Sequence, residues 1–473
     1  MVKGISRRTA FLMILILAFV SFGWALADAF RTRSGDGAGN FSYPFGSFGT
    51  VHVRSPPREP QGVVLLISDS GGPDDRDAQI SASLTRIGLA VVGISLAETR
   101  HKLKPRQADC ISFVNSLDNL SKDVQHRMGV KTYLQPVIAG IGEGGALAYI
   151  ANQQSAVGLY RATVSFGFSP QFRSDWPLCI VRTGKPSRAP NWNLLPVHSV
   201  PAPWIVVAPD PPATSKNGLS LVRFVGAVHN ARLVKGVTAA EQPVPARILS
   251  GIFEPMLQTV ADASPGALAG LPITEITGAG APVTDTMAIF YSGDGGWTGL
   301  NQQITTDLAK KGVPTIGISS LEYFWTAKTP ESAAQDLHKI IQAYGRRWQR
   351  SRVIIIGYSF GADVLPFIYA ALPPDSQRQV VRLSLLGLGG KADFQFHLGS
   401  WLDISGDDAM PTVPAIARLT DVNVQCIRGT TERNNACPDI PTGIADQVLL
   451  PGDHHFNGNA SLIAQTFLNG IQL

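Results

Sequence analysis

The sequence has little charge, few cysteines and no recognisable metal-binding pattern. Charged residues make up 16% of the 473 residues and no Lys or Arg cluster stands out, so nucleic-acid binding has little support. The four cysteines form no Cys-x-x-Cys, and closely spaced histidines of ligand type are missing, which argues against a metal site. Beyond Ala27 no apolar run reaches the about 18 residues that span a bilayer. Nothing in the sequence calls for a cofactor.

The N-terminus has the anatomy of a secretory signal peptide. Three basic residues precede an almost wholly apolar segment, 11–24, and Ala25-Leu26-Ala27 follows as a cleavage site. We predict cleavage after Ala27 and export to the periplasm, with an uncleaved membrane anchor as the alternative. Removing the three basic residues lowers the formal net charge from +5 to +2, so only weak attraction to an anionic membrane surface is expected.

The most telling pattern is an apolar strand that leads into Gly-x-Ser-x-Gly. Residues 353–356 are all β-branched, Gly357–Gly361 carries the motif around Ser359, and the residues after it tolerate a helix. Strand, sharp turn and helix in this order predict a nucleophile elbow, in which the glycines avoid collisions between Cβ atoms and the neighbouring chain. We therefore predict Ser359 as a catalytic nucleophile.

An acid that completes a triad is expected downstream of the nucleophile. Residues 422–429 alternate like a strand and end at a glycine, and Glu432 follows three residues later. In this fold the acid is placed just beyond such a strand, so Glu432 is the predicted acid. Asp439 is the reserve, and Asp421 and Asp446 rank below it.

Two adjacent histidines follow the next short apolar strand, at 447–450. A histidine in the loop after the last strand can reach back over the sheet edge to the nucleophile. We predict that neutral His455, directly before Phe456, takes the proton of Ser359 and that Glu432 orients its ring. His454 is the close alternative.

A hydrolase of this kind also needs an oxyanion hole. The backbone N–H of Phe360, directly after the nucleophile, is one predicted donor. The other should come from the loop after an earlier strand, and Ser292–Trp297, which contains Gly293 and Asp294, follows the apolar segment 287–291. Its glycines allow backbone amides to approach a substrate oxygen closely.

An internal repeat relates the two halves of the chain. Adding 224 to the residue numbers of the first half places Ser68 on Ser292, and Gly71 and Gly72 on two glycines of the Ser292–Trp297 loop. The first half keeps the glycines of the elbow, but Gly142 stands where a nucleophile would be. A glycine cannot attack a carbonyl, so we predict that the first copy is a scaffold or a binding surface.

The fold class predicted is therefore α/β, with two tandem α/β-hydrolase-like domains of which the N-terminal one is degenerate. We expect the signal peptide at 1–27, the degenerate domain at 28–235, a linker with some helix at 236–268 and the catalytic domain at 269–473. An even number of cysteines in an exported chain predicts disulfides within each domain, Cys110 with Cys179 and Cys426 with Cys437. The second bridge would pin the loop of Glu432, and buried free thiols are the alternative.

Several motifs together resemble the VirJ/AcvB family of bacterial virulence proteins. They are Ser-Gly-Asp-Gly-Gly-Trp at 292–297, Ser320–Trp325 with Lys328–Glu331, the elbow segment 357–367, and Gly452–Phe456. The resemblance implies a periplasmic hydrolase that releases lysine from lysyl-phosphatidylglycerol. It also implies contact with the outer leaflet of the inner membrane and a link to virulence and type IV secretion.

A lysyl group carries two amines, so its site should offer carboxylates. Asp294 and Asp363 are the candidates, although Asp363 is equally well explained as a buried structural acid. Trp297 and the aromatic residues 323–325 are expected to line an apolar mouth. The alternatives are an enzyme for another ester or thioester, and a non-catalytic periplasmic interaction protein of a secretion system.

Overall fold

The computed structural model describes residues 39–103, 110–179, 181, 191–209, 220–237, 244–257, 268–278, 284–396 and 409–471. The predicted signal peptide lies outside the described residues. Asn40–Leu473 form one compact unit that contains two large β-sheets. In the described part of the chain, no helix has both the length and the hydropathy to cross a bilayer.

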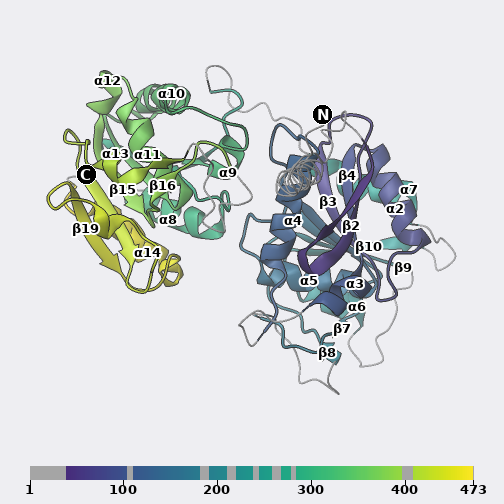
Figure 1. Cartoon of the computed structure of the whole chain (residues 1–473). Helices are drawn as coiled ribbons and strands as arrows, with labels where there is room; N and C mark the ends of the chain where they lie inside the picture. The colour runs from purple at the N-terminus through teal and green to yellow at the C-terminus, as the bar shows by residue number, and fades with distance from the viewer. Residues whose placement is uncertain are drawn as a thin grey trace, which may run out of the picture. The chain divides into compact units, whose positions relative to one another are not determined.

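The two sheets share one strand order except that the first has an additional edge strand, which confirms the predicted pair of α/β domains (Figure 1). The first runs β1 (Phe41–Phe45), β2 (Gly49–Arg54), β4 (Leu89–Ile94), β3 (Gly62–Ile67), β5 (Val137–Ile141), β6 (Ala162–Phe166), β9 (Trp204–Pro209), β10 (Ala231–Val237). The second runs β11 (Ile273–Ile276), β13 (Thr315–Ile318), β12 (Thr286–Tyr291), β14 (Arg352–Tyr358), β15 (Val380–Leu386), β18 (Val424–Gly429), β19 (Ala445–Leu450). Apart from β1, β2 and β11, neighbouring strands are parallel.

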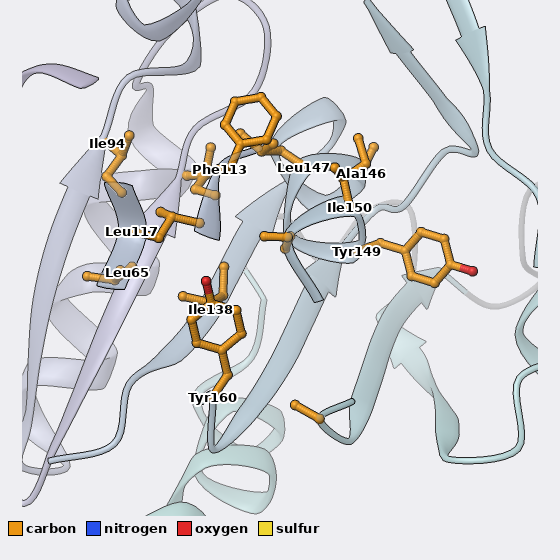
Figure 2. Close-up of a cluster of buried hydrophobic side chains, with 14 of the residues drawn as sticks. Leu65, Ile94, Phe113, Leu117, Ile138, Ala146, Leu147, Tyr149, Ile150 and Tyr160 are labelled. Carbon is orange, nitrogen blue, oxygen red and sulfur yellow. The ribbon is translucent and has the colours of Figure 1, made fainter. Parts of the chain in front are cut away.

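Helices cover both faces of each sheet because the buried strands are largely apolar and successive side chains point to opposite faces. In the N-terminal domain Leu65 of β3 packs toward α4 (Val114–Arg127), α5 (Glu143–Gln154) and α6 (Leu221–Gly226), as Figure 2 shows in part. Leu66 packs toward α2 (Asp75–Arg86) and α7 (Ala246–Phe253). The helix α7, which falls in the predicted linker, thus packs on the first sheet.

The C-terminal domain repeats these layers. Its central strand β12 packs one face toward α10 (Pro330–Trp348), α11 (Phe360–Ala370) and α13 (Thr412–Ile416), and the other toward α8 (Gly299–Lys310) and α14 (Ala460–Leu468). Thr329 caps α10, and Pro330 stands at its first position, as the sequence predicts. The two domains also contain three short helices, α3 (Leu96–Lys102), α9 (Ser320–Tyr323) and α12 (Pro374–Gln377). Two small strand pairs are present as well, β7 (Gln171–Arg173) with β8 (Asn191–Asn193) and β16 (Lys391–Ala392) with β17 (Met410–Pro411).

The repeat of 224 residues extends to the bounds of the elements. The bounds of β3 and α2, shifted by 224, are those of β12 and α8. The side-chain oxygens of Ser68 and Ser292 also make the same bonds, each accepting one amide, from Leu96 and Ser320, and donating to the next carbonyl. The two domains are therefore copies of one architecture.

Both predicted disulfides are present. Cys110 is bonded to Cys179, and Cys426 of β18 is bonded to Cys437. The second closes a loop that contains Glu432, with a sequence separation of 11 residues. Disulfides of this kind persist in oxidising compartments, which fits an exported protein.

Candidate active site

The predicted site residues gather where the strand order of the second sheet reverses. From β12 the chain continues to β13 on one side of the sheet and later to β14 on the other. Crevices form outside the carboxyl ends of strands at such a reversal. The Ser292–Trp297 segment, called here the oxyanion loop, follows β12, and Ser359 follows β14.

Ser359 stands in the strained conformation that the elbow prediction requires. Its φ is 53° and its ψ −120°, and it is one of four residues other than glycine with positive φ in the described chain. Such a conformation is costly and occurs where the surrounding structure imposes it. The side chain is half-buried, so its hydroxyl is not lost in packing.

The two glycines of the motif are required by close backbone contacts. A Cβ on Gly357 would lie 2.4 Å from the carbonyl oxygen of Gly361, and one on Gly361 would lie 2.6 Å from that of Tyr291. Real Cβ atoms do not approach so closely, and the contacted atoms are backbone carbonyl oxygens of Gly361 and Tyr291, which could move only if the chain itself shifted. The motif is thus a structural requirement of the turn as well as a signature.

Glu432 pairs with His454, and not with the predicted His455. The ring nitrogen Nδ1 of His454 lies 2.5 Å from Oε1 of Glu432, whose side chain is 5% exposed. The amide of Gly429 donates to the other carboxylate oxygen at 2.9 Å. The disulfide of Cys426 and the short turn after β18 hold this acid in place.

The ring of His454 lies beside the elbow. It stacks on Tyr358, the residue before the nucleophile, with 5.4 Å between ring centroids. Its Cε1 atom lies 2.7 Å from where a Cβ of Gly387 would be. Gly387 follows Leu386, whose carbonyl accepts the amide of Ser359 at 2.8 Å.

His455 faces the same tyrosine from another direction, which explains why the expected pairing fails. Its Nδ1 lies 3.0 Å from the Tyr358 hydroxyl, and that hydroxyl donates to the carbonyl of His454 at 3.2 Å. After Gly452 the chain turns sharply, with positive φ at Phe456 and Asn457. The two adjacent histidines contact different neighbours, which a sequence pattern does not reveal.

Electrostatics couple Glu432 and His454. Burial alone lowers the pKa of His454, but the hydrogen bond to Glu432 and the charges of Glu432, Asp294 and Asp363 outweigh it and raise the pKa above its ordinary 6.5. Burial alone raises the pKa of Glu432, but the hydrogen bonds from His454 and the Gly429 amide outweigh it and lower the pKa. Both shifts favour an ionised acid next to an imidazolium.

The N-terminal domain shows what the oxyanion amides can hold. Gly142 repeats the elbow, with φ 55° and ψ −115°. One carboxylate oxygen of Asp69, Oδ1, accepts the amide of Glu143 at 3.1 Å and that of Ser70 at 2.7 Å. Burial alone raises the pKa of Asp69, but these amides and Arg76 outweigh it and lower the pKa, so this oxygen carries charge.

The corresponding amides of the C-terminal domain belong to the predicted donors. Glu143 follows the elbow glycine as Phe360 follows Ser359, and Ser70 corresponds to Asp294 in the repeat. Asp69 corresponds to Gly293, which has no side chain to fill the site. A Cβ on Gly293 would lie 3.3 Å from the Cβ of Ser359, so the space beside the serine is close to this position.

The predicted substrate contacts have mixed outcomes. Asp363 lies one turn into α11 and accepts the amide of Gly389 at 2.6 Å. Its side chain is only partly exposed. Burial among protein atoms raises the pKa of Asp363 to about 8. The charges of Asp294 and Asp363 both help to raise the pKa of His454.

The expected aromatic mouth is wrong for three of its four residues. Tyr323, Phe324 and Trp325 are 4%, 0% and 2% exposed, and they pack with other aromatic rings. Trp297 is half-buried, and its ring lies on β13 against Gly317 and Phe290. Packing in the protein interior accounts for the rings of residues 323–325.

Comparison with known proteins finds a family model that matches one domain. Residues 285–473 match the VirJ family, described as "Bacterial virulence protein (VirJ)", which confirms the resemblance for that part of the chain. Among curated proteins none matches the sequence.

Several solved structures resemble one domain at low identity. Est1E from Butyrivibrio proteoclasticus is 11% identical over 42% of this chain and 93% of that chain, with a TM-score of 0.33. An α/β serine hydrolase without a lid from Xanthomonas campestris is 12% identical over 48% and 97%, with a TM-score of 0.31. A lipase-esterase related protein from Clostridium acetobutylicum is 15% identical over 42% and 99%, with a TM-score of 0.31.

Proposed function

We propose, taking residues 285–473 as a VirJ-family domain, that the protein is a serine hydrolase. Ser359 is the nucleophile, His454 the general base, and Glu432 the acid that orients the histidine. The amides of Phe360 and Asp294 stabilise the oxyanion. The observation that carries the proposal is the Glu432–His454 pair beside a serine held in an elbow.

The hydrogen bond to Glu432 sets the tautomer of the histidine. Nδ1 of His454 carries the hydrogen that it donates to Glu432, so Nε2 of the neutral ring is free of hydrogen and can accept the proton of Ser359. The serine oxygen then attacks the ester carbonyl, whose oxygen becomes an anion on the two amides. His454 returns the proton to the leaving alcohol, and water hydrolyses the acyl-enzyme by the same steps.

The N-terminal domain supports the oxyanion assignment independently of any substrate. Asp69 places a charged oxygen on the two equivalent amides at hydrogen-bond distance. Donors that already hold a negative oxygen in one copy of an architecture are suited to a developing oxyanion in the other. Gly293 leaves that place open to a substrate.

For the substrate we propose the aminoacyl ester of lysyl-phosphatidylglycerol, reached at the outer leaflet of the inner membrane from the periplasm. The support is the family resemblance and the acids near His454. Asp363 has a pKa of about 8 and is mostly neutral at pH 7, but an arriving ammonium favours its ionised form. Asp294 and Asp363 are then the contacts for the lysyl amines.

Two experiments test this proposal. Purified protein and its Ser359→Ala variant are incubated with lysyl-phosphatidylglycerol in detergent micelles, and released lysine is measured. Lipids of a deletion strain are then analysed after complementation with either form. Release of lysine and removal of the accumulated lipid by the wild type alone are expected.

Unchanged lipids and phenotypes with Ser359→Ala would instead favour an interaction protein of a secretion system. Hydrolysis of simple esters without release of lysine would keep the hydrolase and reject the lipid. The variant lacks only one hydroxyl, so its fold should be unchanged, and thermal unfolding checks this.

A further inference from the structure

A buried lysine of the N-terminal domain extends toward the other domain. Lys122 in α4 has no exposed surface, and its ammonium donates at 2.8 Å to Asp118, one helical turn earlier. Burying an ion pair is costly, and apolar side chains of similar volume often stabilise a protein as well or better. The pair therefore calls for an explanation beyond the stability of α4.

The same ammonium lies within hydrogen-bond distance of the oxyanion loop. Lys122 Nζ is 3.3 Å from the backbone carbonyl oxygen of Asp294. Asp294 is also the residue whose amide corresponds to one of the two donors that hold Asp69 in the first domain. A charge-assisted hydrogen bond is roughly twice as strong as a neutral one, so this contact restrains the peptide next to the oxyanion donor.

A second contact fixes α4 against the C-terminal domain. The indole N–H of Trp325 donates to the carbonyl of Val130 at 2.7 Å, just beyond the end of α4. The ring stacks on His126, with 4.0 Å between centroids, and His126 lies one turn after Lys122. Trp325 is 2% exposed, so this contact is well packed and holds the face of α4 that carries Lys122.

A third contact meets the far end of the oxyanion loop. A Cβ on Gly158 of the N-terminal domain would lie 2.5 Å from the carbonyl oxygen of Trp297. The neighbouring Val157 places its Cβ 3.3 Å from the corresponding position on Gly299, where α8 begins. The oxyanion loop is thus touched by the N-terminal domain both in its middle and at its end.

We propose that the N-terminal domain holds the oxyanion loop of the C-terminal domain in its active geometry, with Lys122 as the positioning residue. This inference rests on the proposed serine hydrolase and deepens it. The copy that has lost its own nucleophile supplies a side chain that orients the donor of the other copy. Lys122 touches no reacting atom and would act on the reaction through Asp294.

The test removes the buried pair without leaving an unpaired charge. The variant is Asp118→Leu/Lys122→Met, which keeps the volume and apolar packing of α4. Its matched control is Asp123→Leu/Arg127→Met, the neighbouring pair on the same helix with the same spacing. Arg127 lies over Tyr43 of the N-terminal domain, so the control disturbs a helix ion pair away from the oxyanion loop.

We expect kcat for a chromogenic ester to fall about tenfold in the Lys122 variant with KM unchanged, because the defect acts on the transition state. The control should keep both constants. Hydrogen exchange of the peptide that covers Ser292–Trp297 should be faster in the Lys122 variant only. Equal kcat and equal exchange in folded wild type and Lys122 variant would overturn the proposal.

The exchange measurement separates this inference from the proposed function. If the wild type hydrolyses no ester and reacts with no fluorophosphonate, the serine hydrolase is rejected, but loop exchange still reports whether Lys122 restrains Asp294. If the double variant does not fold, Gly158→Val replaces it as a wedge against Trp297. The wedge should speed exchange of the loop and lower kcat, and an unchanged loop would again overturn the inference.

Discussion

The N-terminal and C-terminal domains share one architecture, and two of the positions at which they differ lie next to each other in space. In the first, Asp69 and Gly142 face each other, and in the second their counterparts are Gly293 and Ser359. A Cβ on Gly142 would lie 2.4 Å from the carboxylate of Asp69, so a serine there would require this carboxylate to move. The second copy has the predicted nucleophile Ser359 next to a glycine, and the first has a carboxylate next to a glycine.

The comparison shows how little of an architecture must change to remove a site for chemistry. The elbow glycines, the turn conformation and the serine that braces the loop are kept in both copies. An internal carboxylate then satisfies amides that a substrate oxygen would otherwise use. The carboxylate thus gives both amides a partner within the first domain.

We expect the largest loss of activity from a change at the histidine after the last strand, which the first domain lacks. No histidine occurs between Val237, where the first sheet ends, and the second sheet, whereas the second domain has two after β19. We expect His454→Ala to lower kcat for a chromogenic ester by at least about 10⁴-fold, as for other general bases of triads. His455→Ala should retain activity within about tenfold, because its loss affects only placement. The reverse ranking would reassign the base.

Replacing the acid should change both the rate and its pH dependence. Glu432→Gln should lower kcat about 10³- to 10⁴-fold, because the amide no longer fixes the tautomer of His454. In the wild type the rate should rise with pH through a histidine pKa above 6.5, since the neutral ring is the base. The variant loses the interaction that raises this pKa, so its rise should shift to lower pH. An unshifted profile would argue that Glu432 does not act on the base.

The filled site of the first domain can be transferred to the second. Gly293→Asp should place a carboxylate on the oxyanion amides and lower kcat about 10²- to 10³-fold. Gly295→Asp is the matched control, because a Cβ there meets only Thr298, at 3.9 Å. Adding Ser359→Gly to Gly293→Asp should restore thermal stability that the single change loses, as in the natural pair of Asp69 and Gly142. No recovery would show that the two positions are not coupled.

The disulfides should give the smallest effects on activity. In a chain-entropy account, removing Cys110–Cys179 costs about 4 kcal/mol and removing Cys426–Cys437 about 3 kcal/mol of unfolding free energy, following the loop lengths. Only the second bridge closes the loop of Glu432, so only its double serine variant should lower kcat, by a few-fold. Denaturant unfolding and ester hydrolysis measure the two effects. Loss of activity without the first bridge alone would point to a larger role of the N-terminal domain.

Prediction from the sequence succeeded where the requirement is local. Gly357 and Gly361 are needed wherever a strand turns into a helix around a serine, and the cysteines of each half are close enough to pair within one domain. Prediction failed for the aromatic residues 323–325 and for the pairing of Glu432. Their neighbours come from other elements, and the sequence order does not contain those contacts.

The amino-acid sequence by itself determined the two copies, the elbow around Ser359 and the order of elements, because periodicity, glycine positions and repeat spacing are properties of the chain. Pairing of the cysteines within each half was a prediction, which the structure confirms. Only the tertiary structure decided that His454 meets Glu432, that Asp69 fills the site of the first domain, and that Lys122 extends to Asp294. These contacts join residues distant in the chain, and their geometry follows from how strands, turns and domains pack.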